Sequence, residues 1–405
     1  MLTSGMRRKS PLGAVGALLA AAVLLAAPDL LPDRLAEVSR QVEEVRGRKF
    51  LRPVPASEID PAQARRVLRE KIVEGLPAPP DDAFRSLAAL GLIDDATGML
   101  DILVDFYASQ VVAFYDPQPR RFYVVKGAEG LGEAGEEAGD MAAGLIYSHE
   151  LTHALQDESL RLDERIRQLR DDGDRAFALQ SLLEGEATLV MVRVALAGLP
   201  GADESLEDQI APLLSAGALE RANVPKDVPD YFVDQLFFPY TEGTAFARAA
   251  LKRGGWEEMD RLWKNPPLSS AEILHGSPYP APAQGLIPAN LASIAPGQRF
   301  VYADTLGEWT LRFLLGRALG QDEAARAAAG WRGDRIAYFA GPGAMSYLWR
   351  IRFDEPAAAA RFEAALRKAR AKRPAPAAET ITRKGADVVV SSGLANRPPE
   401  TNPQQ

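Results

Sequence analysis

Two of this chain's three histidines stand four residues apart in the stretch "YSHELTHALQD", residues 147–157. Positions i and i+4 of an α-helix lie on one face, one turn apart, so His149 and His153 can direct ring nitrogens at one metal ion. Glu150 lies about 100° around the same helix, where it can act on a water molecule rather than bind the metal. The pattern therefore predicts Zn²⁺ as cofactor and Glu150 as general base. The plainer alternative is a surface helix with a local His–Glu cluster.

A catalytic zinc ion needs three protein ligands and a position left for water. The metzincin pattern would place a further histidine six residues after His153, but Ser159 stands there, so that class is excluded. The following apolar stretch "SLLEGEATLVM" offers two glutamates instead. Glu184 and Glu186 would lie about 200° apart on a helix, so only one of them can face the ion.

Gly185 favours Glu184 as the third ligand. Glycine removes a side chain where two helices must approach closely, and the neighbouring Ala187 and Thr188 keep that surface small. Glu186 then lies behind the ligands or, in the alternative, is itself the ligand. A core helix with both acids facing solvent is a further interpretation. It is disfavoured because carboxylates amid so many leucines and valines would be buried and would need partners.

Three more residues are candidates for the surroundings of the ion. His275 lies in a Pro- and Ser-rich segment and Tyr240 in "FFPYTEG"; either can donate a hydrogen bond to an oxyanion, or serve ordinary packing. His275 in place of a glutamate ligand is another alternative. Asp157, four residues after His153, can orient a ligand histidine through its other ring nitrogen, or be a solvated acid at the helix end.

The segment "VVAFYDPQPRRFYVV", residues 111–125, predicts a β-hairpin ahead of the histidine helix. Its edge strand can take up an extended peptide, or the hairpin can be packed on both edges. The loop that follows matches G-x-G-x-x-G at Gly130, Gly132 and Gly135. A dinucleotide site is disfavoured, because the preceding strand belongs to a hairpin and several nearby glutamates would repel a pyrophosphate.

The two metal-binding stretches together resemble the gluzincin class of zinc metallopeptidases. The variants "HELTHALQD" and "LLEGEAT", with "FYDPQPRRFYVV" upstream and "FFPYTEG" to "SSAEILH" downstream, are similar to a bacterial and archaeal family of predicted exported zinc peptidases. The likeness runs from about residue 100 to 390, and the chain departs from the family form at Ser270, Glu272 and Gly276. The resemblance implies zinc ligands at His149, His153 and Glu184 and a base at Glu150.

The composition and the N-terminal segment limit the partners and the compartment that we expect. The net charge is −8 over 405 residues, with no basic block interleaved with aromatics, so nucleic acid is not an expected partner. The lack of cysteine excludes disulfides, cysteine-bound zinc and a thiol nucleophile. Arg7, Arg8 and Lys9 precede an uncharged stretch over 11–27, which predicts a signal peptide or an N-terminal membrane anchor over residues 1–28. We therefore expect an extracytoplasmic protein, whether periplasmic, secreted or membrane-anchored.

The elements that must position the site are helices over about 141–159 and 176–198. Asp60 is expected to cap a helix that Pro61 opens. Helical patterns at 304–319 and 355–369, with strand-like runs at 335–340, 346–353 and 386–392, predict a small C-terminal α+β domain. The expected segments are an N-terminal helical region (29–100), a metallopeptidase domain (101–300), the C-terminal domain (301–394) and a disordered tail (395–405).

These observations predict a mainly helical α+β protein with a zincin-like metallopeptidase domain and a small β-hairpin or edge sheet. The expected function is an exported zinc peptidase acting on a peptide or protein substrate. The first alternative is a metallopeptidase-like envelope module that binds or senses and retains zinc without turnover, although a purely structural site does not need Glu150. A structural envelope protein is the other alternative. Residues 28–100 are hypothesised to cover the cleft.

Overall fold

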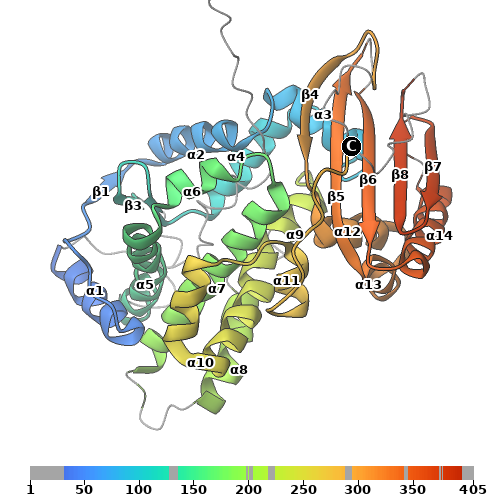
Figure 1. Cartoon of the computed structure of the whole chain (residues 1–405). Coiled ribbons are helices and arrows are strands. Elements are labelled where there is room, and N and C mark those ends of the chain that lie inside the picture. Colours follow the sequence, from blue (N-terminus) through green and yellow to red (C-terminus); the bar gives the residue numbers. More distant parts are fainter. Residues whose placement is uncertain are drawn as a thin grey trace, which may run out of the picture.

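The computed structural model describes residues 32–126, 136–197, 204–217, 224–287, 294–341, 345–373 and 377–394, with the single residues 199 and 375. The chain is of mixed α+β class, with many helices and two small sheets that stand apart (Figure 1). In chain order the elements are α1 (Pro32–Arg46), β1 (Ala56–Ile59), α2 (Pro61–Gly75), α3 (Pro80–Leu90), α4 (Met99–Gln110), β2 (Ala113–Asp116), β3 (Arg121–Val125), α5 (Glu136–Leu160), α6 (Leu162–Gln168), α7 (Gly173–Ala197), α8 (Glu204–Gly217), α9 (Asp230–Phe238), the π-helix η3 (Pro239–Gly243), α10 (Thr244–Lys264), α11 (Ser270–His275), β4 (Arg299–Asp304), α12 (Gly307–Leu319), α13 (Gln321–Ala328), β5 (Trp331–Ala340), β6 (Met345–Phe353), α14 (Pro356–Lys372), β7 (Glu379–Lys384) and β8 (Asp387–Ser392).

Three of the predicted features fall outside the described residues: the signal peptide or anchor at 1–28, the glycine motif at 130–135 and the tail at 395–405. Among the helices that the structure does describe, none combines the length and the apolar character needed to cross a membrane.

The start of α2 is set by local signals. The Asp60 carboxylate accepts a hydrogen bond from the backbone N–H of Gln63 at 2.7 Å, and the Gln63 side chain accepts one from the Asp60 backbone at 2.9 Å. This reciprocal pair is a capping box, which satisfies two backbone donors that a helix start leaves without partners. The predicted cap at Asp60 is confirmed.

The predicted hairpin is also confirmed, since β2 pairs with β3 in antiparallel register, Ala113 opposite Val124 and Asp116 opposite Arg121. β1 adds to the other edge of β3 in parallel, which gives the order β1-β3-β2. The sequence indicated only extended chain for β1, because its four residues are too few to show a period.

α7 runs through the middle of the helical part, with α5, α10 and η3 packed around it (Figure 1). It is buried on every side over most of its length, including the stretch from Ala176 to Val190. A helix that is apolar all round is one that folds into a core. Its two central glutamates therefore enter the core with it and need partners there.

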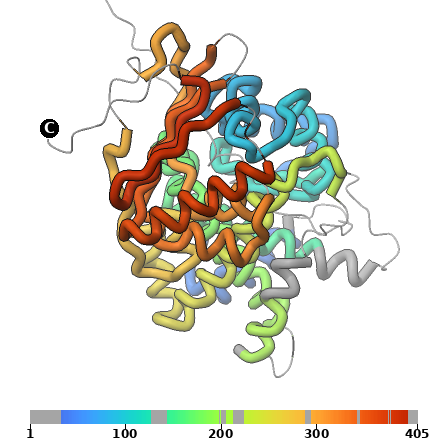
Figure 2. Tube along the Cα trace, turned by 90° about the vertical axis from the view of Figure 1, so that its right-hand side faces the viewer, coloured from blue at the N-terminus to red at the C-terminus, as the bar shows by residue number. Residues whose placement is uncertain are grey.

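The C-terminal sheet is antiparallel throughout, in the order β4-β5-β6-β8-β7. α12 and α14 pack against it (Figures 1 and 2). Ile336 and Tyr338 belong to the core on that side, whereas Ala337 and Phe339 pack beneath Ile294 on the opposite face. Because both faces are covered, β5 contains an apolar run rather than a strict alternation. The sequence did not predict β4 or the polar edge strand β7.

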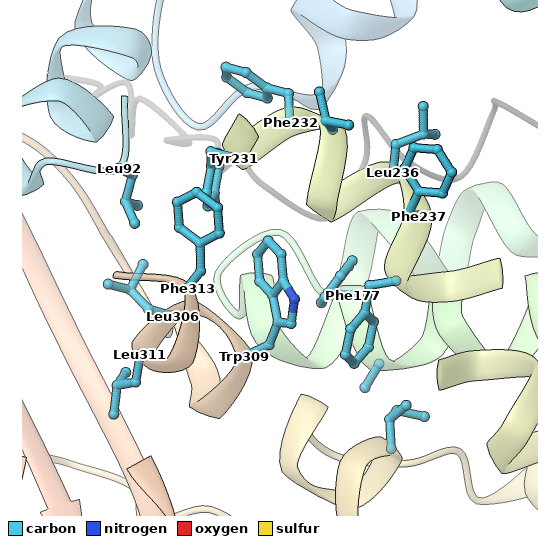
Figure 3. Packing of buried hydrophobic residues seen from close by; sticks show 14 of the residues in the cluster. Leu92, Phe177, Tyr231, Phe232, Leu236, Phe237, Leu306, Trp309, Leu311 and Phe313 are labelled. Atoms are coloured by element: carbon cyan, nitrogen blue, oxygen red, sulfur yellow. The ribbon is translucent and has the colours of Figure 1, made fainter. Parts of the chain in front are cut away.

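The C-terminal sheet and the helical part share one hydrophobic core. Trp309 of α12 packs against Phe177 of α7, with ring centroids 5.0 Å apart, and against Tyr231 of α9 at 5.6 Å (Figure 3). Burying aromatic side chains of this size contributes much of the energy that holds two segments together. Phe177 also lies two helical turns before Glu184, so this contact fixes the helix that carries the candidate third ligand.

The N-terminal helices are part of the same structure. Leu68 of α2, Phe84 of α3 and Leu103 of α4 lie in the main core, and Val42 of α1 lies in a second core with residues of α5 and β3. Residues 32–100 are therefore built into the fold, and their packing gives no support to the hypothesis of a separate cover over the cleft.

Candidate metal centre

The crossing of α5 and α7 brings three side chains to one point. His149 Nε2 lies 3.1 Å from Glu184 Oε2 and 3.2 Å from His153 Nε2, and His153 Nε2 lies 3.3 Å from the same carboxylate oxygen. In a tetrahedral zinc site, with ligand atoms about 2.05 Å from the ion, two ligand atoms are about 3.3 Å apart. The three separations match the edges of one face of such a tetrahedron. Two imidazole nitrogens and one carboxylate oxygen are also the donor set that zinc accepts in catalytic sites.

Two glycines allow the backbones of α7 and η3 to approach each other closely. A β-carbon on Gly185 of α7 would lie 2.2 Å from the carbonyl oxygen of Gly243, and one on Gly243 would lie 2.1 Å from the carbonyl oxygen of Ser181. The close approach predicted at Gly185 is thus confirmed, and its partner is η3. π-Helical turns are rare and often occur at functional sites.

η3 also brings Tyr240 to the candidate metal group. Its ring stacks on that of His149, with centroids 5.9 Å apart and planes 28° from parallel, and its side chain is buried. Of the two residues that the sequence offered as oxyanion donors, Tyr240 is the one that the structure places against a candidate ligand.

Glu150 lies beside the group with its two oxygens in different surroundings. Oε2 accepts a hydrogen bond of 2.8 Å from the backbone N–H of Tyr115 on β2, whereas Oε1 is buried and has no hydrogen-bond partner among the described residues. Burial raises the pKa of Glu150 to about 8, against a lowering by the His153 charge and the Tyr115 hydrogen bond. An orphaned carboxylate oxygen in this position is what a general base acting on water requires.

Burial and mutual charge set the protonation of the three candidate ligands. Burial by itself would raise the pKa of Glu184, but the His153 charge and hydrogen bonds from both histidines hold it below its usual value. Burial lowers the pKa of His149. The pKa of His153 is raised, because the Glu184 carboxylate outweighs the effect of burial. Glu184 is therefore kept as an anion, the form that binds a cation.

Glu186 points away from the candidate ligands. Its Oε1 accepts from Arg46 Nε at 2.5 Å, and its Oε2 accepts from Trp263 Nε1 at 2.6 Å and from Gln156 Nε2 at 2.9 Å. Both oxygens are thus occupied, and the structure assigns Glu186 to the region behind the ligands rather than to the ligand position.

His275 is not part of the His149–His153–Glu184 group. Its Nε2 lies 2.9 Å from both carboxylate oxygens of Glu308 on α12, and its ring stacks on Tyr279 at 5.4 Å. The neighbouring Arg312 bonds the same carboxylate. This geometry makes His275 a residue that ties α11 to α12, and it gives no support to a role as oxyanion donor or as ligand.

Neither role considered for Asp157 matches its surroundings. The carboxylate is 1% exposed, so it is not a solvated acid. Its oxygens accept hydrogen bonds from the Tyr115 hydroxyl at 2.9 Å and from the Leu162 backbone N–H at 2.8 Å. Asp157 therefore links the end of α5 to β2 and to the start of α6, and Gln156 takes the place beside His153.

The hairpin is held on both of its edges near the site. β1 occupies the free side of β3, and the Tyr115 N–H of β2 is engaged by Glu150. At Tyr115 the outer edge of β2 thus faces α5, so this donor is not open to an added strand. At this position the structure agrees with a hairpin packed on both edges rather than with an edge strand open to a peptide.

The sequence missed four residues around the site: Tyr115, Gln156, Arg46 and Trp263. Gln156 had a local signal, because it lies three positions after His153 and so on the same helix face. The other three come from β2, α1 and α10, and no spacing rule connects them to the histidines.

Comparison with known proteins finds one matching domain family. A family model described as a domain of unknown function, DUF8575, matches residues 298–397, the segment that holds the five-stranded sheet and α12 to α14. It contains none of the residues of the candidate metal centre. No curated protein matches the chain, and neither does any solved structure. Function must therefore be argued from the geometry of the site.

Proposed function

We propose that this chain is a zinc-dependent peptidase with a gluzincin-type site in a zincin-like fold. The observation that carries the proposal is the convergence of His149, His153 and Glu184 at separations of 3.1 to 3.3 Å. The orphaned Oε1 of Glu150 beside this group supports an active site over a structural one. A structural zinc site normally closes its fourth position with a protein ligand and has no need of a carboxylate beside the ion.

In this proposal the three candidate ligands would hold the ion, which would polarise the substrate carbonyl and make water more acidic. Glu150 takes the proton from the attacking water and passes it to the leaving amine. The Tyr115 N–H fixes the orientation of the Glu150 carboxylate, so that Oε1 remains for the proton.

Tyr240 is the proposed donor to the oxyanion that forms as the carbonyl is attacked. Its ring lies over His149, and the crossing of Gly185 with Gly243 holds the turn that carries it. Removal of a single oxyanion donor typically costs about 10²–10³-fold in turnover. We expect Tyr240→Phe to lower kcat by an amount in that range while zinc remains bound.

The proposed substrate is a peptide or protein met outside the cytoplasm. This part of the proposal depends on residues 1–28 alone, whose basic start and uncharged stretch are typical of an export signal or an anchor.

The decisive experiment compares the wild type with Glu150→Gln. Zinc content is measured by mass spectrometry of the purified full chain, and hydrolysis is followed on casein and on a peptide library. The substituted amide can still accept from the Tyr115 N–H but cannot take a proton, so we expect both proteins to bind zinc and only the wild type to cleave. A wild type that binds no zinc, or a variant that cleaves as fast, would overturn the proposal.

One observation favours the alternative of a zinc-retaining module without turnover. His149, Glu150 and Glu184 are 4%, 2% and 1% exposed, so a substrate carbonyl cannot reach them without some opening of the surroundings. Zinc bound stoichiometrically in both proteins, with no cleavage of any peptide by either, would select this alternative.

A further inference from the structure

We propose that Gln156, held in place by Glu186 and Arg46, is a positioning residue that fixes the ring of His153 with its proton on Nδ1 and its lone pair on Nε2. The inference rests on the proposed function, because the lone pair on Nε2 matters only if the nitrogen binds a cation. It adds three residues to the site, none of which is a ligand and one of which lies in the first helix of the fold.

The orientation of the Gln156 amide follows from its neighbours. Its Nε2 lies 3.0 Å from the carbonyl oxygen of Leu183 and 2.9 Å from Oε2 of Glu186. Both of these atoms are acceptors, so the amide nitrogen must face them; the flipped amide would set oxygen against two oxygens. Oε1 of Gln156 consequently faces His153.

This orientation determines the tautomer of His153. Nδ1 of His153 lies 2.9 Å from Oε1 of Gln156, and an amide oxygen can only accept. Nδ1 must therefore carry the proton. A histidine that binds a cation is neutral, so the lone pair would then be on the other nitrogen, Nε2, which lies 3.3 Å from Glu184 and 3.2 Å from His149.

Two further donors, Arg46 and Trp263, hold the Glu186 carboxylate in its orientation. Arg46 Nε is 2.5 Å from Oε1, Trp263 Nε1 is 2.6 Å from Oε2, and both charged side chains of the Arg46–Glu186 pair are almost completely buried. The Arg46 guanidinium lies 4.5 Å from the ring centroids of both Trp256 and Trp263. It also bonds Asp260 at 2.6 Å.

The Arg46–Glu186–Gln156 chain therefore extends from α1 through α7 to the histidine helix. A buried arginine held by two tryptophans and two carboxylates cannot move without cost, because a broken buried ion pair leaves an uncompensated charge. Residues behind metal ligands fix ring orientation and tautomer in this way, and their loss typically lowers metal affinity about 10–100-fold.

The test compares the wild type with two full-length variants and one control variant. Gln156→Leu removes the acceptor with little change in volume. Arg46→Met removes the cation that holds Glu186. Arg193→Met is its matched control, since Arg193 also lies over the Trp256 ring, at 5.3 Å, but pairs with Glu207 rather than with Glu186.

Zinc affinity is measured by competition with a chelator, and thermal unfolding identifies variants that fail to fold. We expect Gln156→Leu and Arg46→Met to bind zinc about 10–100-fold more weakly than the wild type. Arg193→Met should bind like the wild type.

The second readout does not depend on zinc. With three histidines in the chain, the ring N–H protons of ¹⁵N-histidine-labelled protein can be assigned by NMR. The Nδ1 proton of His153 should exchange slowly in the wild type and rapidly in Gln156→Leu.

Equal zinc affinity and equal proton exchange in the wild type and Gln156→Leu would overturn the positioning role and leave the zinc site intact. A wild type that binds no zinc would instead overturn the proposed function, and the positioning role with it.

Discussion

At the scale of single residues, two glutamates only two positions apart in the sequence have different partners in the structure. Glu184 meets both histidines, whereas Glu186 meets Arg46, Trp263 and Gln156. We expect Glu184→Ala to lose zinc more severely than Glu186→Ala, because the first removes a proposed ligand and the second only a residue proposed to position one. The loss for Glu186→Ala should stay within the range of about 10–100-fold seen for such residues. Chelator competition measures both, and the reverse order would show that the ligand has been assigned wrongly.

The residues that sequence alone could find are those that one helix displays together. His149 and His153 follow from the helical period, and Glu184 was favoured because Gly185 adjoins it. The helical period could not decide between Glu184 and Glu186 on its own, since the answer lies in a partner 140 positions away: Arg46 holds Glu186. The role of His275 could not be predicted for the same reason: its carboxylate partner, Glu308, lies 33 positions later on another helix.

At the scale of elements, the site depends on how closely α7 approaches η3. A β-carbon on Gly185 would lie 2.2 Å from the Gly243 carbonyl oxygen and 2.7 Å from the Thr244 backbone nitrogen, and neither backbone atom can move alone. We expect Gly185→Ala to lower the free energy of unfolding by about 1–3 kcal/mol, the usual cost of overpacking. Zinc binding should weaken too, since the displaced segment carries Glu184.

Gly144→Ala is the matched control for this helix crossing. Gly144 is also helical, but a β-carbon there would meet only the end of the flexible Arg34 side chain, at 3.2 Å. Alanine is favoured over glycine within a helix by about 1 kcal/mol, so this variant should be as stable as the wild type or slightly more so. Denaturant unfolding compares the two, and equal stability of both variants would show that the crossing has room to adjust.

Elements with strong local signals were predictable, and those defined by distant partners were not. The capping box at Asp60 and the hairpin around Asp116 lie within a few residues of chain. β1 and β7 gave no apolar period, because β1 has four residues and β7 is a largely exposed edge strand whose one apolar residue is Ile381. β1 becomes a strand only by pairing with β3, a distant part of the chain, and that pairing is not encoded in its composition. β7 pairs with the next strand, β8, across a short turn, and its polar sequence alone gave no sign of it.

At the scale of the whole molecule, the C-terminal sheet and α7, the helix that carries Glu184, are joined by more than apolar contacts. Asp304, at the end of β4, is fully buried at the start of α7. Its Oδ1 accepts hydrogen bonds of 2.8 Å from the backbone N–H groups of Gly173 and Thr305, and its Oδ2 has no hydrogen-bond partner among the described residues. Burial raises its pKa from 3.8 to about 7; Asp172 adds to the rise, and Arg335 and the two backbone donors oppose it.

A raised carboxyl pKa makes stability depend on pH in a definite direction. The folded protein holds the Asp304 proton more tightly than the unfolded chain does, so this contribution favours folding most below the unfolded pKa, near pH 4. It declines as the pH rises towards about 7 and is constant above that. A rise of this size corresponds to at most about 4 kcal/mol.

We expect Asp304→Asn, which keeps the oxygen acceptor and cannot ionise, to remove this part of the pH dependence. The measurement is the difference in unfolding free energy between wild type and variant from pH 4.5 to 8, with Asp101→Asn, whose side chain is exposed, as a control that should follow the wild type. A difference that stays flat across this range would contradict the prediction, because it would mean that the pKa of Asp304 in the folded protein lies outside pH 4.5 to 8.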